Sequence, residues 1–215
     1  GGAISFLIAF PVLRTKGVYM VLATFAIAEI VAGIILNSSY LGGPTGMIIN
    51  TYIETEVILI VAIIIILLSF YLMSTRIGLA MRAVHDDEAV ADLMGVNKRA
   101  IQVGAFALGG AIAGLSGGLY ALYFGFIEAQ YFNANISIFV LLYVLIGGTQ
   151  TAWGPLLGAS FFTLIPEALR IGDDWRFFIF GVIIVAMMIL RPEGIVTRDA
   201  LDRVSTRLFP RKSNV

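Results

Sequence analysis

The sequence predicts an all-α, polytopic integral membrane protein, and three observations carry that prediction. Of its 215 residues, 59% are apolar and 13% are charged, whereas a soluble domain has about half apolar and about 25% charged residues. The mean hydropathy is +0.95. The apolar residues also come in long runs: residues 17–36 contain one charge and residues 57–73 contain none, and a helix needs about 20 such residues to cross a bilayer.

These runs define seven hydrophobic segments, and we expect about six or seven of them to lie in the membrane. They cover residues 1–13, 17–37, 55–74, 100–126, 135–147, 154–169 and 176–190. The first segment has no initiator Met and no basic residue before it, so it is a poor signal peptide. We expect it to be the end of a transmembrane helix that begins earlier in a longer protein.

The distribution of basic residues orients these segments. Lys and Arg accumulate in short cytoplasmic loops. If the segments alternate across the membrane, twelve of the fourteen basic residues fall on one side. We therefore expect the loop after residue 13, the polar stretch 75–99 and the C-terminal tail 191–215 to be cytoplasmic. Arg170 and Arg176 are the two basic residues expected outside.

The number of spans in residues 135–169 stays open. The apolar run 136–146 would be about 16 Å long as a helix, which is too short to cross the bilayer alone. It is followed by GGTQTAWGP at 147–155 and by another apolar run to Leu169. Two short passes and a re-entrant pair of half-helices both fit, because broken helices are tolerated where they are buried in protein or line a cavity.

Glycine is concentrated in one segment. Residues 104–118, GAFALGGAIAGLSGG, carry six glycines. Gly110, Gly114 and Gly118 are four residues apart, a spacing that allows helices to approach closely in lipid. This face either packs against another helix or, through the bare backbone at Gly110 and Gly114, lines a translocation path.

The chain offers little catalytic or metal-binding chemistry. GLSGG at 114–118 matches the pattern of a serine nucleophile, but Ser116 needs a base within hydrogen-bond reach, and the single histidine, His85, lies in the polar stretch. With no cysteine and one histidine, no metal site is expected. A phosphate-binding G-x-x-x-x-G-K-[ST] loop is also absent. Uphill transport would therefore draw its energy from an ion gradient or from a partner.

Glu29 is the ionisable residue that lies well inside a predicted span. A carboxylate in the membrane costs several kcal/mol unless it is paired or protonated. Glu29 either bonds to a neighbouring helix or sits beside a substrate route as a proton or ion site. Both alternatives stay open.

Residues 76–101 are polar, but their pattern still predicts helix. Apolar residues recur at helical spacing on both sides of a break near His85 and Asp86. Acids open the second helix, from about Asp87, where the positive end of the helix dipole favours them, and Gly95 suits a left-handed C-cap. A connector needs only a few residues, so we expect a short amphipathic helix that docks onto another protein.

Four stretches together resemble the permease subunits of branched-chain amino-acid ABC importers of the LivM type. They are RTKGVYMVLATFAIAEIVAGIILN…LGGPTGM, STRIGLAMRAVHDDEAVADLMGVN, LIGGTQTAWGPLLGA and GVIIVAMMILRPEGI. The similarity covers nearly the whole chain, with the stretches in the family's order. The resemblance implies one transmembrane permease domain over residues 1–215, shortened at its N-terminus relative to the family, with a cytoplasmic coupling segment at 75–99. It implies a transport subunit rather than an enzyme.

In that family, the stretch corresponding to EAVADLMG forms a cytoplasmic helix that docks into a cleft of the ATPase subunit. Carried over, this coupling helix would cover about residues 86–95. The residues expected at the ATPase are Asp86, Glu88, Ala91 and Gly95. This chain has Val90 where the family commonly has Ala.

The resemblance also implies cargo, partners and location. The cargo would be leucine, isoleucine or valine, delivered by an extracytoplasmic binding protein that meets the loop at Gly42, Gly43 and Pro44. ATPase subunits would use the ATP, a second homologous permease subunit would lie alongside, and this chain would bind no cofactor and no nucleic acid. The location would be the inner membrane of a bacterium or archaeon, with the C-terminus in the cytoplasm. The alternatives are a related permease for urea or short amides, and a gradient-driven secondary transporter that uses Glu29.

Overall fold

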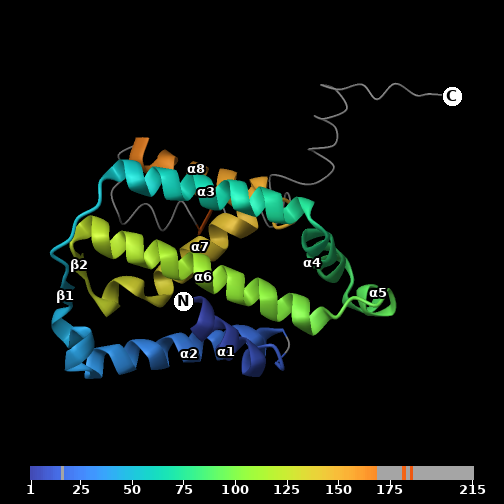
Figure 1. Ribbon diagram of the computed structural model, residues 1–215, viewed down its shortest axis with the longest axis horizontal. Helices are drawn as coiled ribbons and strands as arrows, with labels where there is room; N and C mark the ends of the chain where they lie inside the picture. Colours follow the sequence, from blue (N-terminus) through green and yellow to red (C-terminus); the bar gives the residue numbers. More distant parts are fainter. Residues whose placement is uncertain (16, 169–180, 183–184, 186–215) are drawn as a thin grey trace. The chain divides into compact units, whose positions relative to one another are not determined.

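Eight α-helices make up most of the part of the chain that the structure describes (Figure 1). The structure is a computed structural model, and it describes residues 1–15, 17–168, 181–182 and 185. The helices are α1 (Gly2–Val12), α2 (Val18–Asn37), α3 (Thr55–Ser74), α4 (Arg76–Asp86), α5 (Glu88–Leu93), α6 (Lys98–Phe124), α7 (Ala134–Gly147) and α8 (Trp153–Ala168). Between them lie the 3-10 turns η1 (Ser39–Leu41), η2 (Gly43–Thr45) and η3 (Ala129–Phe132), and the strands β1 (Met47–Ile48) and β2 (Phe126–Ile127).

Six of the predicted hydrophobic segments correspond to helices. Four helical stretches are long and apolar enough to cross a membrane: Tyr19–Asn37, Thr55–Ser74, Lys98–Phe124 and Ala129–Gly147. The prediction of an all-α, polytopic membrane protein is therefore confirmed. The predicted segment 176–190, apart from residues 181, 182 and 185, lies outside the described residues. So do Arg170, Arg176 and the tail 191–215.

The pattern of side-chain burial is also that of a protein surrounded by lipid. Most large apolar side chains on the spans are exposed, and the buried apolar residues in the described part are few: Ala9, Val12, Val84, Ala91, Val103, Ala121, Ile146 and Phe162. Lipid tails are as apolar as leucine, so a membrane helix gains little by burying leucine and instead packs where small residues let backbones approach. The core of this chain is therefore small and lies at its closest helix contacts.

The chain forms two compact units, Gly1–Asn133 and Ala134–Val215. In the first unit, α1 runs antiparallel to α6 along the glycine-rich face, with Gly1 against Gly114 and Ser5 against Gly110. The prediction of a single permease domain over residues 1–215 stays a prediction.

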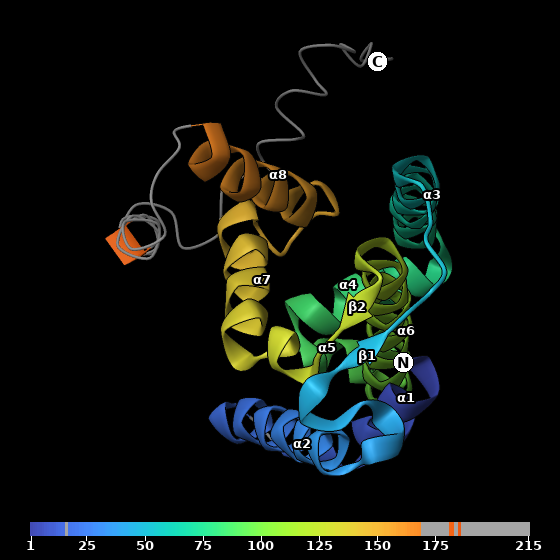
Figure 2. The same ribbon diagram turned by 90° about the vertical axis from the view of Figure 1, so that its left-hand side faces the viewer.

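A two-stranded antiparallel ladder closes one end of the first unit (Figure 2). Met47 pairs with Ile127 and Ile48 with Phe126, which ties the loop after α2 to the end of α6. Gly46, with φ 71°, precedes the ladder, and a Cβ there would lie 2.7 Å from the carbonyl oxygen of Ile127. Only glycine fits a position with positive φ and no room for a side chain.

The other end of the first unit is basic. It holds the end of α1, the end of α3, the helices α4 and α5, and the start of α6 (Figure 1). The described basic residues of this unit all lie there: Arg14, Arg76, Arg82, Lys98 and Arg99. The loop after residue 13 and the stretch 75–99 thus share one end, as the charge distribution predicts, and we call it the basic end. That this end is cytoplasmic stays a prediction.

The second unit begins with a close pair of short helices. α7 has 14 residues and α8 has 16, about 21 and 24 Å in length. A Cβ at Gly158 would lie 3.1 Å from the Cα of Gly147, so the backbones touch. The rings of Tyr143 and Phe162 stack with their centroids 5.8 Å apart. A close pair of short helices is compatible both with two short passes across the membrane and with a re-entrant pair, so both alternatives stay open.

Candidate functional site

The polar stretch forms two helices with a sharp break, as predicted. α4 ends at Asp86, and Asp87 is extended, with φ −156° and ψ 111°. The Asp87 Oδ1 atom accepts hydrogen bonds from the backbone N–H groups of Ala89 (2.8 Å) and Val90 (3.1 Å). Such an N-cap satisfies helix donors that would otherwise have no partner.

The second helix also ends as predicted. Gly95 has φ 81°, its N–H donates to the carbonyl of Asp92 at 3.0 Å, and the Val96 N–H donates to that of Ala91 at 3.0 Å. This pair of bonds is the Schellman motif, which favours glycine at the left-handed position. The prediction of a C-cap at Gly95 is confirmed.

One assignment at the break needs correction. We expected Asp86 at the start of the second helix, but it is the last residue of α4. The cap is Asp87, whose carboxylate reaches the first free N–H groups of α5. Only one residue can occupy the N-cap, and adjacent acids in a sequence do not reveal which one it is.

Two of the residues expected to dock onto the ATPase, Ala91 and Glu88, are instead engaged within their own unit. The Ala91 side chain is 2% exposed, and it belongs to the small core with Val84 and Val103. The Glu88 Oε1 atom accepts a hydrogen bond of 3.1 Å from Gln102 Nε2 on α6. Ala91 and Glu88 therefore hold α5 against the rest of the unit, and their docking role stays a prediction.

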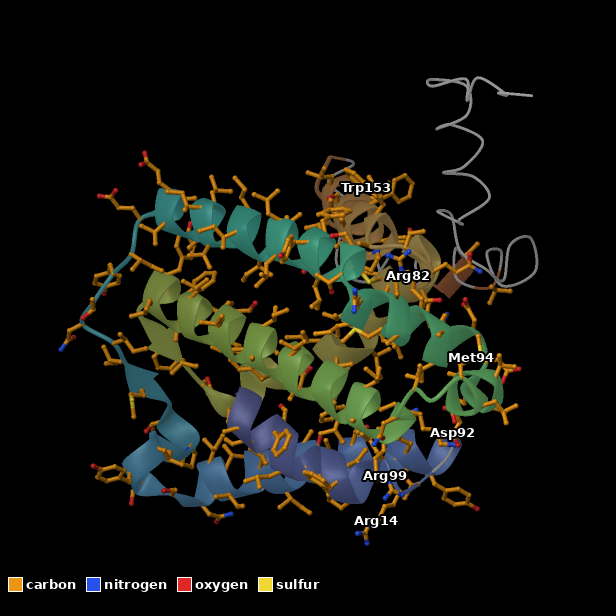
Figure 3. The ribbon with its side chains drawn as sticks, turned by 45° about the vertical axis from the view of Figure 1, so that its right-hand side comes forward. Arg14, Arg82, Asp92, Met94, Arg99 and Trp153 are labelled. Carbon is orange, nitrogen blue, oxygen red and sulfur yellow. The ribbon has the colours of Figure 1, made fainter. Side chains whose placement is uncertain are left out.

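Three apolar side chains of α5 and its C-cap are exposed. Leu93 is 88% exposed, Met94 81% and Val90 54%, and Met94 lies at the outer tip of α5 (Figure 3). We call these three residues the apolar tip. The neighbouring acids Asp86, Asp87, Glu88 and Asp92 are all exposed.

Leu93 was missed at the level of sequence. Met94 lies three residues after Ala91, the spacing of one helix face, but α5 ends at Leu93 and Met94 is its C-cap, so the regular face does not continue to Met94. The signal that remains is local: two large apolar residues in succession, just before a C-cap glycine.

The glycines of α6 divide into two groups. A Cβ at Gly114 would lie 2.9 Å from the Cα of Gly1, and a Cβ at Gly110 would overlap the side chain of Ser5. By contrast, a Cβ at Gly109 or Gly117 meets nothing within 4 Å. The packing alternative thus accounts for Gly110 and Gly114, and their role in a translocation path stays a prediction.

Glu29 lies on the exposed surface of α2. It makes no hydrogen bond or ion pair to any residue that the structure describes. Within its unit, α2 meets α1 and the three 3-10 turns. Because Glu29 is exposed on α2, it could either bond to a neighbouring helix or serve as a proton or ion site, and both alternatives stay open.

The loop at the other end of the unit is shaped by glycine. Gly42, Gly43 and Gly46 have φ values of 92°, 54° and 71°. Gly43 is buried, whereas Pro44 and Tyr40 are exposed. Gly42 and Gly43 therefore form the turn, and the exposed Pro44 and Tyr40 are what a partner would meet. That the partner is a binding protein stays a prediction.

The structure does not support Ser116 as a nucleophile that uses His85 as its base. Ser116 lies about 27 Å along α6 from its start, whereas His85 lies near the end of α4, at the basic end. Within the described residues, no three His, Cys, Asp or Glu side chains are grouped to hold a metal ion.

Long apolar helices joined at one end by a capped, polar helix pair define a multi-pass membrane protein. The family model described as branched-chain amino acid transport system / permease component matches residues 1–190. The chain therefore belongs to that family, and the predicted resemblance to the LivM-type permeases is confirmed.

Individual relatives are named as transport permeases. The high-affinity branched-chain amino acid transport system permease protein LivM of Escherichia coli K12 is 27% identical over an alignment 230 residues long, which takes in 90% of this chain and 54% of LivM. BraD, the permease protein of the corresponding system in Pseudomonas aeruginosa, is 23% identical, over 79% of this chain and 56% of BraD.

A third relative carries a different cargo in its name. The autoinducer 2 import system permease protein LsrC of Photorhabdus laumondii is 33% identical over 135 residues, which cover 59% of this chain and 40% of LsrC. The chain spans about half the length of the curated relatives it matches. No solved structure matches it.

Proposed function

We propose that this chain is a transmembrane permease subunit of an ATP-binding-cassette importer for branched-chain amino acids. An extracytoplasmic binding protein delivers leucine, isoleucine or valine, a second homologous permease subunit lies alongside, and separate ATPase subunits use the ATP. The location is the inner membrane of a bacterium or archaeon, with the basic end in the cytoplasm. Family membership supports the proposal, as do the names of LivM and BraD.

The observation that carries the proposal is the apolar tip of α5. Leu93 and Met94 are 88% and 81% exposed, on a short helix that is capped at both ends. A large apolar side chain that stays in water forgoes about 1.5–3 kcal/mol of burial. Two such side chains at the tip of a rigid helix, outside the spans, fit a partner with an apolar cleft.

In this mechanism the chain transmits movement and carries no catalytic group. ATP binding closes the ATPase pair, and the clefts that hold α5 move with it. Because α5 continues from α4 and contacts α6 through the Glu88–Gln102 hydrogen bond, its displacement reorients the spans between outward-open and inward-open states. The acidic rim of α5 would pair with basic residues beside the cleft and set the orientation of docking.

Cross-linking tests the docking partner. The chain has no cysteine, so Leu93→Cys introduces the one thiol of this part of the protein. Any cysteine elsewhere in the full-length protein is replaced by serine, and the thiol is cross-linked in native membranes. We expect capture of a P-loop ATPase, identified by mass spectrometry. Ala91→Cys is the matched control on the same helix, because its side chain is buried, and Tyr40→Cys is an exposed control at the opposite end. Neither should capture the ATPase.

A thiol at Leu93→Cys that is labelled freely from the cytoplasm but captures no ATPase would contradict the proposal. The gradient-driven transporter that uses Glu29 would then be favoured. Its signature is uptake that an uncoupler abolishes and that loss of any ATPase leaves unchanged.

Competition for uptake tests the cargo. We expect cells that carry the full system to take up labelled leucine, with unlabelled isoleucine and valine competing. LsrC shows that a relative can bear the name of another cargo. Competition by urea or short amides, with none by valine, would assign the chain to a related permease for those compounds.

A further inference from the structure

The corner between α3 and α4 is one of two one-residue joints at the basic end; the other, at Asp87, separates α4 from α5. α3 ends at Ser74 and α4 begins at Arg76, so Thr75 is the only residue between the two helices. The Thr75 hydroxyl donates to the carbonyl of Leu72 at 2.7 Å and accepts from the N–H of Gly78 at 3.4 Å. One side chain thus serves the last turn of α3 and the first turn of α4.

Gly78 lets the two helices touch. It is buried, and a Cβ at this position would lie 2.6 Å from the Cα of Met73 and would press on the carbonyl oxygen of Leu72. Both of those atoms belong to the backbone of α3 and have no freedom to move aside. Any side chain at Gly78 would therefore force α4 away from the end of α3.

Arg82 adds a second attachment, one turn further along α4. Its Nη2 atom donates a hydrogen bond to the carbonyl of Met73 (Figure 3). That carbonyl is one of the last four of α3, which have no partner inside the helix, and a cation is favoured at the negative end of a helix dipole. The Nε atom of Arg82 is buried and has no hydrogen-bond partner among the residues that the structure describes. A buried donor without a partner is unusual. At this position it accompanies the bond from the same guanidinium to the end of α3.

The joint on the other side of α5 is looser. Four residues, 94–97, separate α5 from α6, and a Cβ at Gly95 would meet nothing within 4 Å among the described residues. The Glu88–Gln102 hydrogen bond is the side-chain bond that crosses this joint, and Glu88 is exposed to water. Toward α6, α5 thus has one exposed side-chain hydrogen bond among the described residues, whereas α4 meets α3 through the close contact at Gly78 and the bond from Arg82.

We propose that Gly78 and Arg82 lock α4 to the end of α3, so that α4, α5 and the α3 span move as one lever. The proposal rests on the proposed function and deepens it: movement received at the apolar tip is delivered first to α3. Arg82 is a positioning residue, because it acts through the backbone of α3 and touches neither cargo nor nucleotide.

The first experiment measures the joint itself. Spin labels at Leu59→Cys on α3 and Leu79→Cys on α4, both exposed positions, report the distance between the two helices in the full-length protein. Leu59 lies about 22 Å along α3 from its end, so a change of angle at the corner changes this distance. We expect one narrow distribution of distances in the doubly labelled protein with no other substitution. Adding Arg82→Met should make that distribution at least twofold broader.

The choice of variants separates the lock from general damage. Methionine is unbranched and adaptable, and Arg82→Met removes the unpaired Nε together with the bond to Met73, so we expect the protein to fold. Arg82→Lys keeps one donor at the end of the chain and should restore the narrow distribution. Arg76→Met removes an exposed arginine from the same helix and should change nothing. Gly78→Ala disrupts the contact between α3 and α4 independently of Arg82 and should also broaden the distribution of distances.

The second experiment measures coupling in the reconstituted complex. We expect Arg82→Met to lower the amount of amino acid transported per ATP hydrolysed at least tenfold while ATP hydrolysis continues, and Arg82→Lys to retain most of the coupling. A narrow distance distribution in Arg82→Met overturns the lock. A broad distribution with unchanged transport per ATP overturns the lever. If the background complex transports nothing when given ATP, the proposed function fails instead, and the distance measurement, which needs no ATPase, still tests the lock.

Discussion

The exposure of Leu93 leads to a prediction with a definite size. Leu93→Ala should weaken binding of the ATPase to the permease without altering the stability of this chain. The substitution removes three carbon groups, each worth about 0.8 kcal/mol on burial, and 88% of the side chain is exposed in the free chain. Docking therefore has about 2 kcal/mol to gain there, which corresponds to a loss of affinity of about 30-fold.

The assay is a titration of detergent-solubilised, full-length permease with its ATPase, read by fluorescence anisotropy, beside a thermal melt of the permease alone. The melt should not move, because Leu93 makes few contacts within this chain. Ala91→Leu, on the opposite face of the same helix, is the contrasting variant. Ala91 is 2% exposed, and overpacking a buried site costs about 1–3 kcal/mol, so this variant should lower the melting temperature.

Two results would refute the reasoning. If Leu93→Ala binds the ATPase as tightly as the unaltered protein, the apolar tip is not the docking surface. If Leu93→Ala lowers the melting temperature as much as Ala91→Leu does, then Leu93 packs within the protein and its exposure in this chain is not that of the whole molecule.

Three further predictions concern contacts within each of the two units. Asp87→Ala should destabilise α5 by about 1 kcal/mol through loss of the N-cap, seen as roughly fivefold faster amide exchange in α5, while Asp87→Asn changes it little. Gly110→Leu should separate α1 from α6 and lower the melting temperature, whereas Gly109→Leu should not, because only the first position faces Ser5. Gly158→Leu should part α7 from α8 and release the stacked Tyr143 ring, measured as greater accessibility of that ring to modification.

The spans were predictable because lipid imposes a simple rule. A membrane helix is apolar on all sides, so a long uncharged run predicts it without any knowledge of its neighbours. The run at 55–74 coincides with α3, and the segment 17–37 differs from α2 by one residue. The caps were predictable for a similar reason, because Gly95 and the acids before α5 act on the backbone within a few residues of themselves.

Which face of a helix turns inward was not predictable. Gly109, Ala113 and Gly117 repeat at the same spacing as Gly110 and Gly114, so either row could have received a partner helix. The contact with Gly1 and Ser5 of α1 selects one row, and that contact joins residues more than a hundred positions apart in the chain.

The sequence by itself determined where the spans lie, which end is basic and where the polar helix pair is capped, since each depends on composition or on a few neighbouring residues. The tertiary structure decided that Ala91 and Glu88 face the chain, that Leu93 and Met94 face away, and that Gly78 and Arg82 join α4 to α3. The physical reason is that burial and close packing depend on a second segment, and its position is set by the fold of the whole unit rather than by any local pattern.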